Sequence, residues 1–135
     1  DDNSIYDAIW QPEIKSQFNY NKVLIFNLDP DGNIIWEQVI HKNQRSFDDE
    51  GVYSSFILLN EGSQLRYLFN EMLGRQFRLH SFALKGEGTA EQVDIFNSDR
   101  RIMILVPRLA KQTSLKEVVI PSFTRDAFQL IKFNF

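Results

Sequence analysis

Apolar and polar residues alternate along this chain in short runs, which is the spacing of half-buried β-strands. One six-residue pattern of aromatic and aliphatic positions occurs clearly at residues 77–82 and 128–133, and more faintly at residues 21–26. The two clear copies lie 51 residues apart, since 128 − 77 = 51. We therefore expect the same kind of strand at all three places.

A second phrase, Phe-x-Leu with a glycine four residues after the leucine, occurs at residues 26–32 and again 56 residues later at residues 82–88. Self-similarity at a period of about 50 residues is typical of stacked β-sheet units such as propeller blades. The expected fold is all-β, with antiparallel sheets in about two to three propeller-like units, and the alternative is a β-sandwich or barrel. An incomplete propeller leaves sheet edges that something else must cover.

Turn chemistry divides the chain into predicted strands at residues 22–28, 33–40, 52–59, 76–84, 90–97, 101–106, 116–120 and 127–133. The polar residues 41–51 predict an exposed loop, residues 107–115 a basic loop, and residues 121–126 a connection. A short helical turn is expected near residues 5–9, inside an N-terminal segment that spans residues 1–20.

Residues 63–73 fit two interpretations. Leucine, phenylalanine and methionine recur at the spacing of one helix face, while residues 65, 67 and 69 equally fit the alternation of a strand. The tight turn at residues 60–63 follows directly on a predicted strand, which is the usual arrangement of a hairpin. We therefore favour a strand, and a helix is the alternative.

Composition limits the classes of protein that this chain can belong to. Its 135 residues suit one domain, with repeated strand units over residues 21–135. Fifteen basic against eighteen acidic residues give a net charge of −3, which provides no basic surface for nucleic acid. There is no cysteine for disulfides or thiolate metal sites, and no apolar run approaches the length of about 18 residues that a membrane-spanning helix needs.

Several short motifs carry a resemblance to a known group of proteins. They are Asp31-Gly32-Asn33-Ile34-Ile35-Trp36, then Ile40, Lys42 and Gln44, then Asp48-Asp49 with Tyr53-Ser54-Ser55, and finally Leu68-Phe69-Asn70. This set resembles the C-terminal part of uncharacterised exported bacterial proteins, often lipoproteins, with propeller-like repeats. His41 and Glu71 depart from that pattern, which has proline and aspartate there. The resemblance implies a periplasmic or cell-surface location and a longer parent protein, and it implies no reaction.

Two groups of residues suggest chemistry. Asp29 and Asp31 look like the start of a calcium loop, but position 40 is Ile where an EF-hand needs Glu, so a turn is the better interpretation. His41 with Asp48 or Asp49 and a serine at 46, 54 or 55 could form a hydrolytic triad, yet no glycine-flanked serine accompanies them. His80 lies inside an apolar phrase, where a core histidine is the simpler explanation. No catalytic residue, metal site or cofactor is therefore expected.

The polar stretch from residue 42 to residue 53 is the segment whose composition exceeds what a connection needs. The candidate binding residues are Lys42, Gln44, Asp48, Asp49 and Tyr53. Basic residues between positions 100 and 116 would protect a strand edge or contact an anionic partner. Trp10, Trp36, Tyr53 and Tyr67 would form a sugar-stacking platform or pack in the core.

The sequence thus predicts a non-catalytic binding or interaction domain of an exported bacterial protein. Its partner would be a protein or a glycan, and self-association through sheet edges is a further expectation. Two alternatives stay open, a hydrolase acting on carbohydrate or peptide, and a structural unit that closes a larger repeat array.

Overall fold

A computed structural model describes residues 16–73, 76–97, 104–124 and 127–135. These residues form an all-β, antiparallel fold, and within them neither a closed barrel nor a propeller is found. The strands are β1 (Gln17–Leu28), β2 (Ile34–Phe47), β3 (Phe56–Asn60), β4 (Gln64–Leu73), β5 (Gln76–Lys85), β6 (Ala90–Asn97), β7 (Ile104–Leu105), β8 (Lys111–Ser114), β9 (Glu117–Thr124) and β10 (Ala127–Asn134). A 3₁₀ turn, η1 (Pro107–Leu109), separates β7 from β8.

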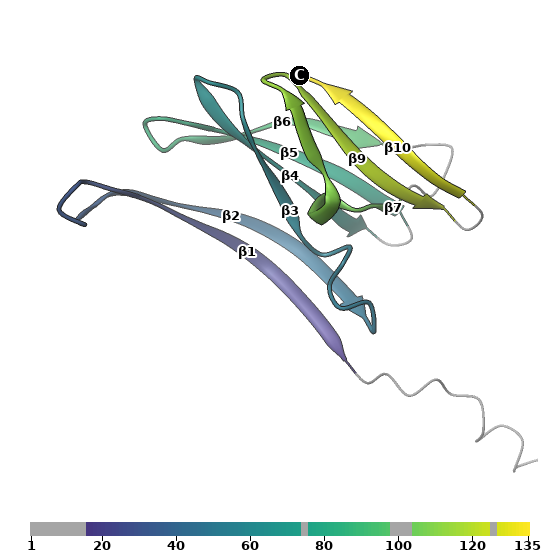
Figure 1. The fold of residues 1–135 in the computed structure, drawn as a ribbon. Helices are drawn as coiled ribbons and strands as arrows, with labels where there is room; N and C mark the ends of the chain where they lie inside the picture. Colours follow the sequence, from purple (N-terminus) through teal and green to yellow (C-terminus); the bar gives the residue numbers. More distant parts are fainter. Residues whose placement is uncertain (1–15, 74–75, 98–103, 125–126) are drawn as a thin grey trace, which may run out of the picture.

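The strands form three sheets that follow one another along the chain (Figure 1). The first is the β1–β2 hairpin, and the second is a meander in the order β3-β4-β5-β6. In the third sheet β9 pairs with β10 along one edge and with both β7 and β8 along the other. Strands β7 and β8 therefore pair with successive parts of the same edge of β9, and turn η1 separates them.

The central sheet is buried on both faces, and β4 shows this best because residues 66–70 are all buried. Leu68 packs into a cluster shared with β7 and β9, which includes Leu105 and Ile120. Its neighbour Phe69 points the other way, into a cluster with Val23 and Ile40 of the hairpin. Side chains alternate across a strand, so one central strand supplies both cores and holds three layers together.

Most predicted strands are confirmed. The hairpin around residues 29–32, the hairpin around residues 85–88 and the final strand all form. Residues 63–73 are β-strand over Gln64–Leu73, as favoured, because alternate side chains serve the two cores. The helical turn predicted near residues 5–9 lies outside the described residues.

Four predicted boundaries are wrong. Residues 41–51 are not an exposed loop, since β2 continues to Phe47 and buries alternate polar side chains against the central sheet. Residues 107–115 contain η1 and β8, and residues 121–124 extend β9 rather than connecting strands. The strand predicted from residue 52 begins only at Phe56, because residues 50–53 form turns. Tertiary pairing overrides local composition in the first three cases.

The three copies of the six-residue pattern lie in β1, β5 and β10. All three are strands, as expected, but their neighbours differ. Strand β5 has a partner on each edge, while β10 pairs only with β9, and β1 only with β2, among the described residues. The pattern therefore predicts strand type correctly, and the propeller-like arrangement is not confirmed.

Candidate functional site

Two of the five predicted binding residues lie in the interior. Lys42 is 6 % exposed and Gln44 is 3 % exposed, because both point from β2 toward the central sheet. The intervening residues of β2, such as Asn43, are exposed. The expectation that Lys42 and Gln44 lie in an exposed loop is therefore wrong, since both are buried side chains of strand β2.

The Lys42 ammonium lies among aromatic rings. Its Nζ is 5.4 Å from the ring centres of both Tyr20 and Phe56 and 5.8 Å from that of Phe69. It donates a hydrogen bond to Gln44 Oε1 over 2.7 Å. Burial lowers the pKa of Lys42 from 10.5 to about 8, while the ring faces favour the charged form.

Gln44 links the hairpin to the central sheet. Its side-chain amide donates to the carbonyl oxygens of Asn70, over 2.5 Å, and of Ser55, over 3.2 Å. Asn70 in turn donates from its own side-chain amide to the carbonyl oxygen of Leu105 in β7. These polar contacts connect all three sheets through one buried residue of β4.

Asp48 and Asp49 shape the end of the hairpin. Asp48 Oδ1 accepts a hydrogen bond from the Ser16 backbone N–H over 2.8 Å, and Asp49 Oδ1 accepts one from the Gly51 N–H over 3.0 Å. Tyr53 and Gln44 line a small cavity of about 220 Å³ at this end. Two of the predicted residues, Gln44 and Tyr53, thus line one cavity. Asp48 joins the end of β2 to the start of β1, and Asp49 stabilises the turn that follows.

The segment at residues 29–33, which resembles the start of a calcium loop, is a hydrogen-bonded turn, as the sequence analysis favours. Asp29 Oδ1 accepts from the backbone N–H groups of Asp31 (2.9 Å) and Asn33 (2.8 Å), and Oδ2 accepts from the Asn33 side-chain amide (2.9 Å). The Asn33 side-chain bond is the largest of the effects that lower the pKa of Asp29. Among the described residues no group of three or more His, Cys, Asp or Glu side chains is placed to hold a metal ion.

The arrangement that the sequence analysis considers as a hydrolytic triad, and does not favour, is not brought together in the structure. His41 points to the outer side of β2, whereas Ser46 lies on the inner side and accepts a hydrogen bond from Ser54 Oγ over 3.0 Å. His80 is a core histidine, stacked on the Phe69 ring at 5.6 Å. Its Nε2 lies 2.8 Å from Glu71 Oε2 without hydrogen-bond geometry, and burial, opposed by Glu71, lowers its pKa.

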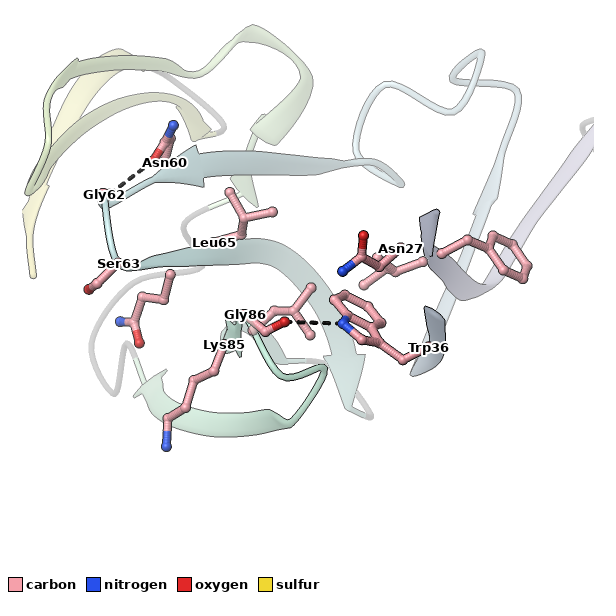
Figure 2. A pocket seen from close by; sticks show the side chains of 12 residues that line it. Asn27, Trp36, Asn60, Gly62, Ser63, Leu65, Lys85 and Gly86 are labelled. Atoms are coloured by element: carbon pink, nitrogen blue, oxygen red, sulfur yellow. Dashed lines mark hydrogen bonds between the residues drawn. The ribbon is translucent and has the colours of Figure 1, made fainter. Parts of the chain in front are cut away.

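A cleft of about 420 Å³ lies between the hairpin and two turns of the central sheet (Figure 2). Trp36 borders it, held in place because its Nε1 donates to the Gly86 carbonyl oxygen over 3.1 Å. The indole also packs on Gly88, where an added Cβ would lie 2.8 Å from the ring. We call this the Trp36 cleft.

Both apolar and polar residues line the rest of the Trp36 cleft. Leu65 and Leu84 are among the apolar lining residues, and the polar ones include Asn27, Gln64 and Lys85. Among the described residues that line the cleft there is no carboxylate, and Lys85 pairs with Glu91. The volume and the mixed lining of this cleft suit a ring-shaped molecule with polar substituents.

The outer side of the β1–β2 hairpin exposes an apolar surface that the sequence analysis did not single out. Along β1 the side chains alternate, so Val23 and Ile25 face the central sheet while Leu24 and Phe26 face outward. Leu24 pairs across the hairpin with Val39. We define the outer hairpin face as Leu24, Phe26, Leu28, Ile35 and Val39, which are 60, 50, 53, 61 and 36 % exposed.

No known protein family, curated protein or solved structure matches this chain. Within the part of the chain that the structure describes, no helix is long and apolar enough to cross a membrane.

Proposed function

We propose that this chain is a non-catalytic interaction domain that stacks another β-sheet on the outer hairpin face. The observation that carries the proposal is the exposure of Leu24, Phe26, Leu28 and Ile35, each at least half exposed on one side of one hairpin. Apolar side chains exposed singly need no explanation, but a contiguous set on one face marks an interaction surface.

The type of partner follows from how the other sheets are covered. The inner side of the hairpin packs on the central sheet, and the central sheet packs on the third sheet, so both internal interfaces are sheet on sheet. The far side of the third sheet also exposes Phe128 and Leu130, at 59 and 63 %. Both ends of the stack are therefore apolar and suited to a further sheet.

This arrangement also supports the structural alternative, a unit within a larger array of stacked sheets. The sheets pack on one another in chain order, and the two end faces expose large apolar side chains, whereas the terminal repeats of a complete solenoid present a polar outer face. An exported location is part of this proposal and is supported by the sequence resemblance alone.

The experiment compares the native chain with the double variant Leu24→Thr, Phe26→Thr by sedimentation velocity, from low micromolar to several hundred micromolar. Threonine keeps β propensity and removes the apolar surface. We expect the native chain to self-associate with rising concentration and the double variant to stay monomeric. Their melting temperatures should agree, because exposed substitutions change stability by within about 0.5 kcal/mol.

The matched control is Leu109→Thr with Leu115→Thr. These leucines are 58 and 62 % exposed but lie in η1 and in the turn before β9, away from the hairpin. The control variant should associate like the native chain. A native chain that stays monomeric throughout, or a control variant that loses association equally, would contradict the proposal.

The Trp36 cleft favours a second function, binding of a pyranose ring of a glycan. An indole held rigidly beside side-chain amides offers both a stacking surface and hydrogen bonds, and rigid aromatic surfaces bind at low entropic cost.

Trp10→Phe makes Trp36 the sole tryptophan, so its emission reports on the cleft. Cellohexaose, xylohexaose or chitohexaose should shift that emission, and Ser63→Phe, which fills the cleft without adding a tryptophan, should remove the shift. No shift with any of the three would exclude this function.

A further inference from the structure

The β1–β2 hairpin has a counterpart inside the central sheet. In one turn the Asp29 N–H donates to the Asn33 carbonyl (2.9 Å) and the Gly32 N–H donates to the Asp29 carbonyl (3.0 Å). The β5–β6 turn repeats both bonds at positions 56 residues later, from Lys85 to Thr89 and from Gly88 to Lys85, each 3.0 Å. The glycines have φ of 88° and 91°, so the two hairpins close in the same way.

This correspondence shows which neighbour β1 lacks. Strand β5 pairs with β6 along one edge and with β4 along the other. Strand β1 corresponds to β5 and pairs with β2, the counterpart of β6, but among the described residues it has no counterpart of β4. The free edge of β1 is therefore the edge that β4 occupies in the complete sheet.

The backbone of β1 is arranged to accept a strand there. Because the Asp29 N–H points across the hairpin and N–H groups alternate between edges, those of Leu28, Phe26 and Leu24 point to the free edge. Their counterparts Leu84 and Phe82 lie opposite Leu65 and Tyr67 of β4.

Over residues 23–28 this edge lacks two of the usual protections against strand addition, because the stretch contains no proline and no charged residue. Lys22 and the register shifts at 20/22 and 27/28 lie at the two ends of the stretch. At the edge of β3, by contrast, a side chain hydrogen-bonds to the backbone of the strand. There the Gln112 side-chain amide donates to the Asn60 carbonyl (2.8 Å) and its oxygen accepts from the Asn60 N–H (3.0 Å), which takes the place of a strand.

We propose that the free edge of β1 takes up an antiparallel β-strand from another polypeptide, in the position that β4 holds beside β5. The inference rests on the proposed function, because it says how the further sheet is attached, but it concerns the edge of the hairpin rather than its face. The strand it fits is extended and apolar on both sides, as β4 is where Tyr67, Leu68 and Phe69 follow one another.

The test uses the full chain, labelled with ¹⁵N, and a synthetic peptide with the sequence of residues 56–73, which contains β3 and β4. Hydrogen exchange is measured by NMR with and without the peptide. Strand addition should slow exchange of the Leu24, Phe26 and Leu28 amides at least about tenfold, since each gains a hydrogen bond. Unchanged exchange at all three amides with the peptide in excess would overturn the proposal.

Two matched variants separate edge from face. Phe26→Thr and Phe26→Pro both remove the outward ring, but only proline removes the N–H that points to the edge. The peptide should still protect Leu24 and Leu28 in the threonine variant and lose this effect in the proline variant, and Leu24→Thr against Leu24→Pro repeats the comparison at a second amide. Equal protection within both pairs would overturn the proposal. Failure of the proposed function would appear instead in sedimentation, as a native chain that stays monomeric or as a Leu109→Thr, Leu115→Thr control that loses association equally.

Discussion

Gln44 donates a hydrogen bond from its side-chain amide to the carbonyl oxygen of Asn70 over 2.5 Å, and so joins the β1–β2 hairpin to the central sheet. The same asparagine donates from its side chain to Leu105 in the third sheet. Both residues are 3 % exposed. Burying a polar group without a hydrogen-bond partner costs the free energy of its desolvation. These hydrogen bonds therefore favour one relative position of the three sheets.

The first prediction concerns Asn70. Asn70→Ala leaves the buried Leu105 carbonyl without its donor and should lower the free energy of unfolding by about 1–3 kcal/mol in urea denaturation. The control Asn19→Ala, on the exposed part of the hairpin, should change it by within about 0.5 kcal/mol. Equal effects of the two substitutions would show that Asn70 does not connect the layers.

The second prediction compares two glycines with the same backbone conformation. Gly62 (φ 86°) and Gly88 (φ 91°) both have positive φ, but a Cβ on Gly62 meets nothing within 4 Å, whereas one on Gly88 meets Trp36 at 2.8 Å. Gly62→Ala should cost about 1–2 kcal/mol of unfolding free energy for the strained backbone. Gly88→Ala should cost about 1–3 kcal/mol more, because the indole must move. Thermal denaturation of both variants measures the difference, and equal losses would contradict the packing of Trp36 on this turn.

The third prediction concerns the pH dependence that buried Lys42 introduces. Its pKa is lowered from 10.5 to about 8 in the folded chain, so the unfolded chain binds the proton more tightly. Stability therefore rises as the pH increases from about 8 to about 10.5, while below about 8 the full cost of the buried charge is present. Relative to Lys42→Met, the native chain should gain about 1–3 kcal/mol between these pH values.

Gln44→Leu is the control for this titration. It removes the hydrogen bond to Lys42 but leaves the lysine in place, so this variant should keep the rise in stability with pH. Urea denaturation at several pH values measures all three proteins. If the native chain and Lys42→Met show the same dependence on pH, Lys42 keeps an ordinary pKa and its aromatic surroundings are more open than described.

The fourth prediction is that calcium does not stabilise the protein. Both Asp29 carboxylate oxygens already accept hydrogen bonds within the turn, and a bound cation would have to displace them. The melting temperature should stay the same across millimolar calcium. A rise that EGTA reverses would mean that the turn rearranges to bind the ion.

The sequence predicts strand positions well where particular residues specify the turn at the end of the strand. Gly32 and Gly88 need positive φ, and the phrase around each predicts the same turn that the structure contains. The strand at residues 64–73 is also predictable, because its preceding turn limits the choice between helix and strand.

The candidate site is predicted less well, because burial depends on which sheet covers a strand. Lys42 and Gln44 look like loop residues by composition, yet the central sheet covers the side of β2 that carries them. Exposed and buried residues alternate over 41–47 in the structure, but residues 41–46 are all polar, so the sequence shows no apolar–polar alternation that would predict a strand there. The apolar outer hairpin face has the reverse problem, since Leu24 and Phe26 would be assigned to a core by sequence alone.

The central claim is that the outer hairpin face is covered by another sheet, and a single thiol tests it most directly. The chain has no cysteine, so Phe26→Cys introduces a unique reactive group on this face, and Asp31→Cys places one in the exposed turn as a control. The rate of maleimide labelling is measured from dilute to concentrated protein. The account predicts that Cys at position 26 becomes at least about tenfold slower to label as the protein associates, while position 31 does not change. Labelling at position 26 that stays equally fast at every concentration would contradict it.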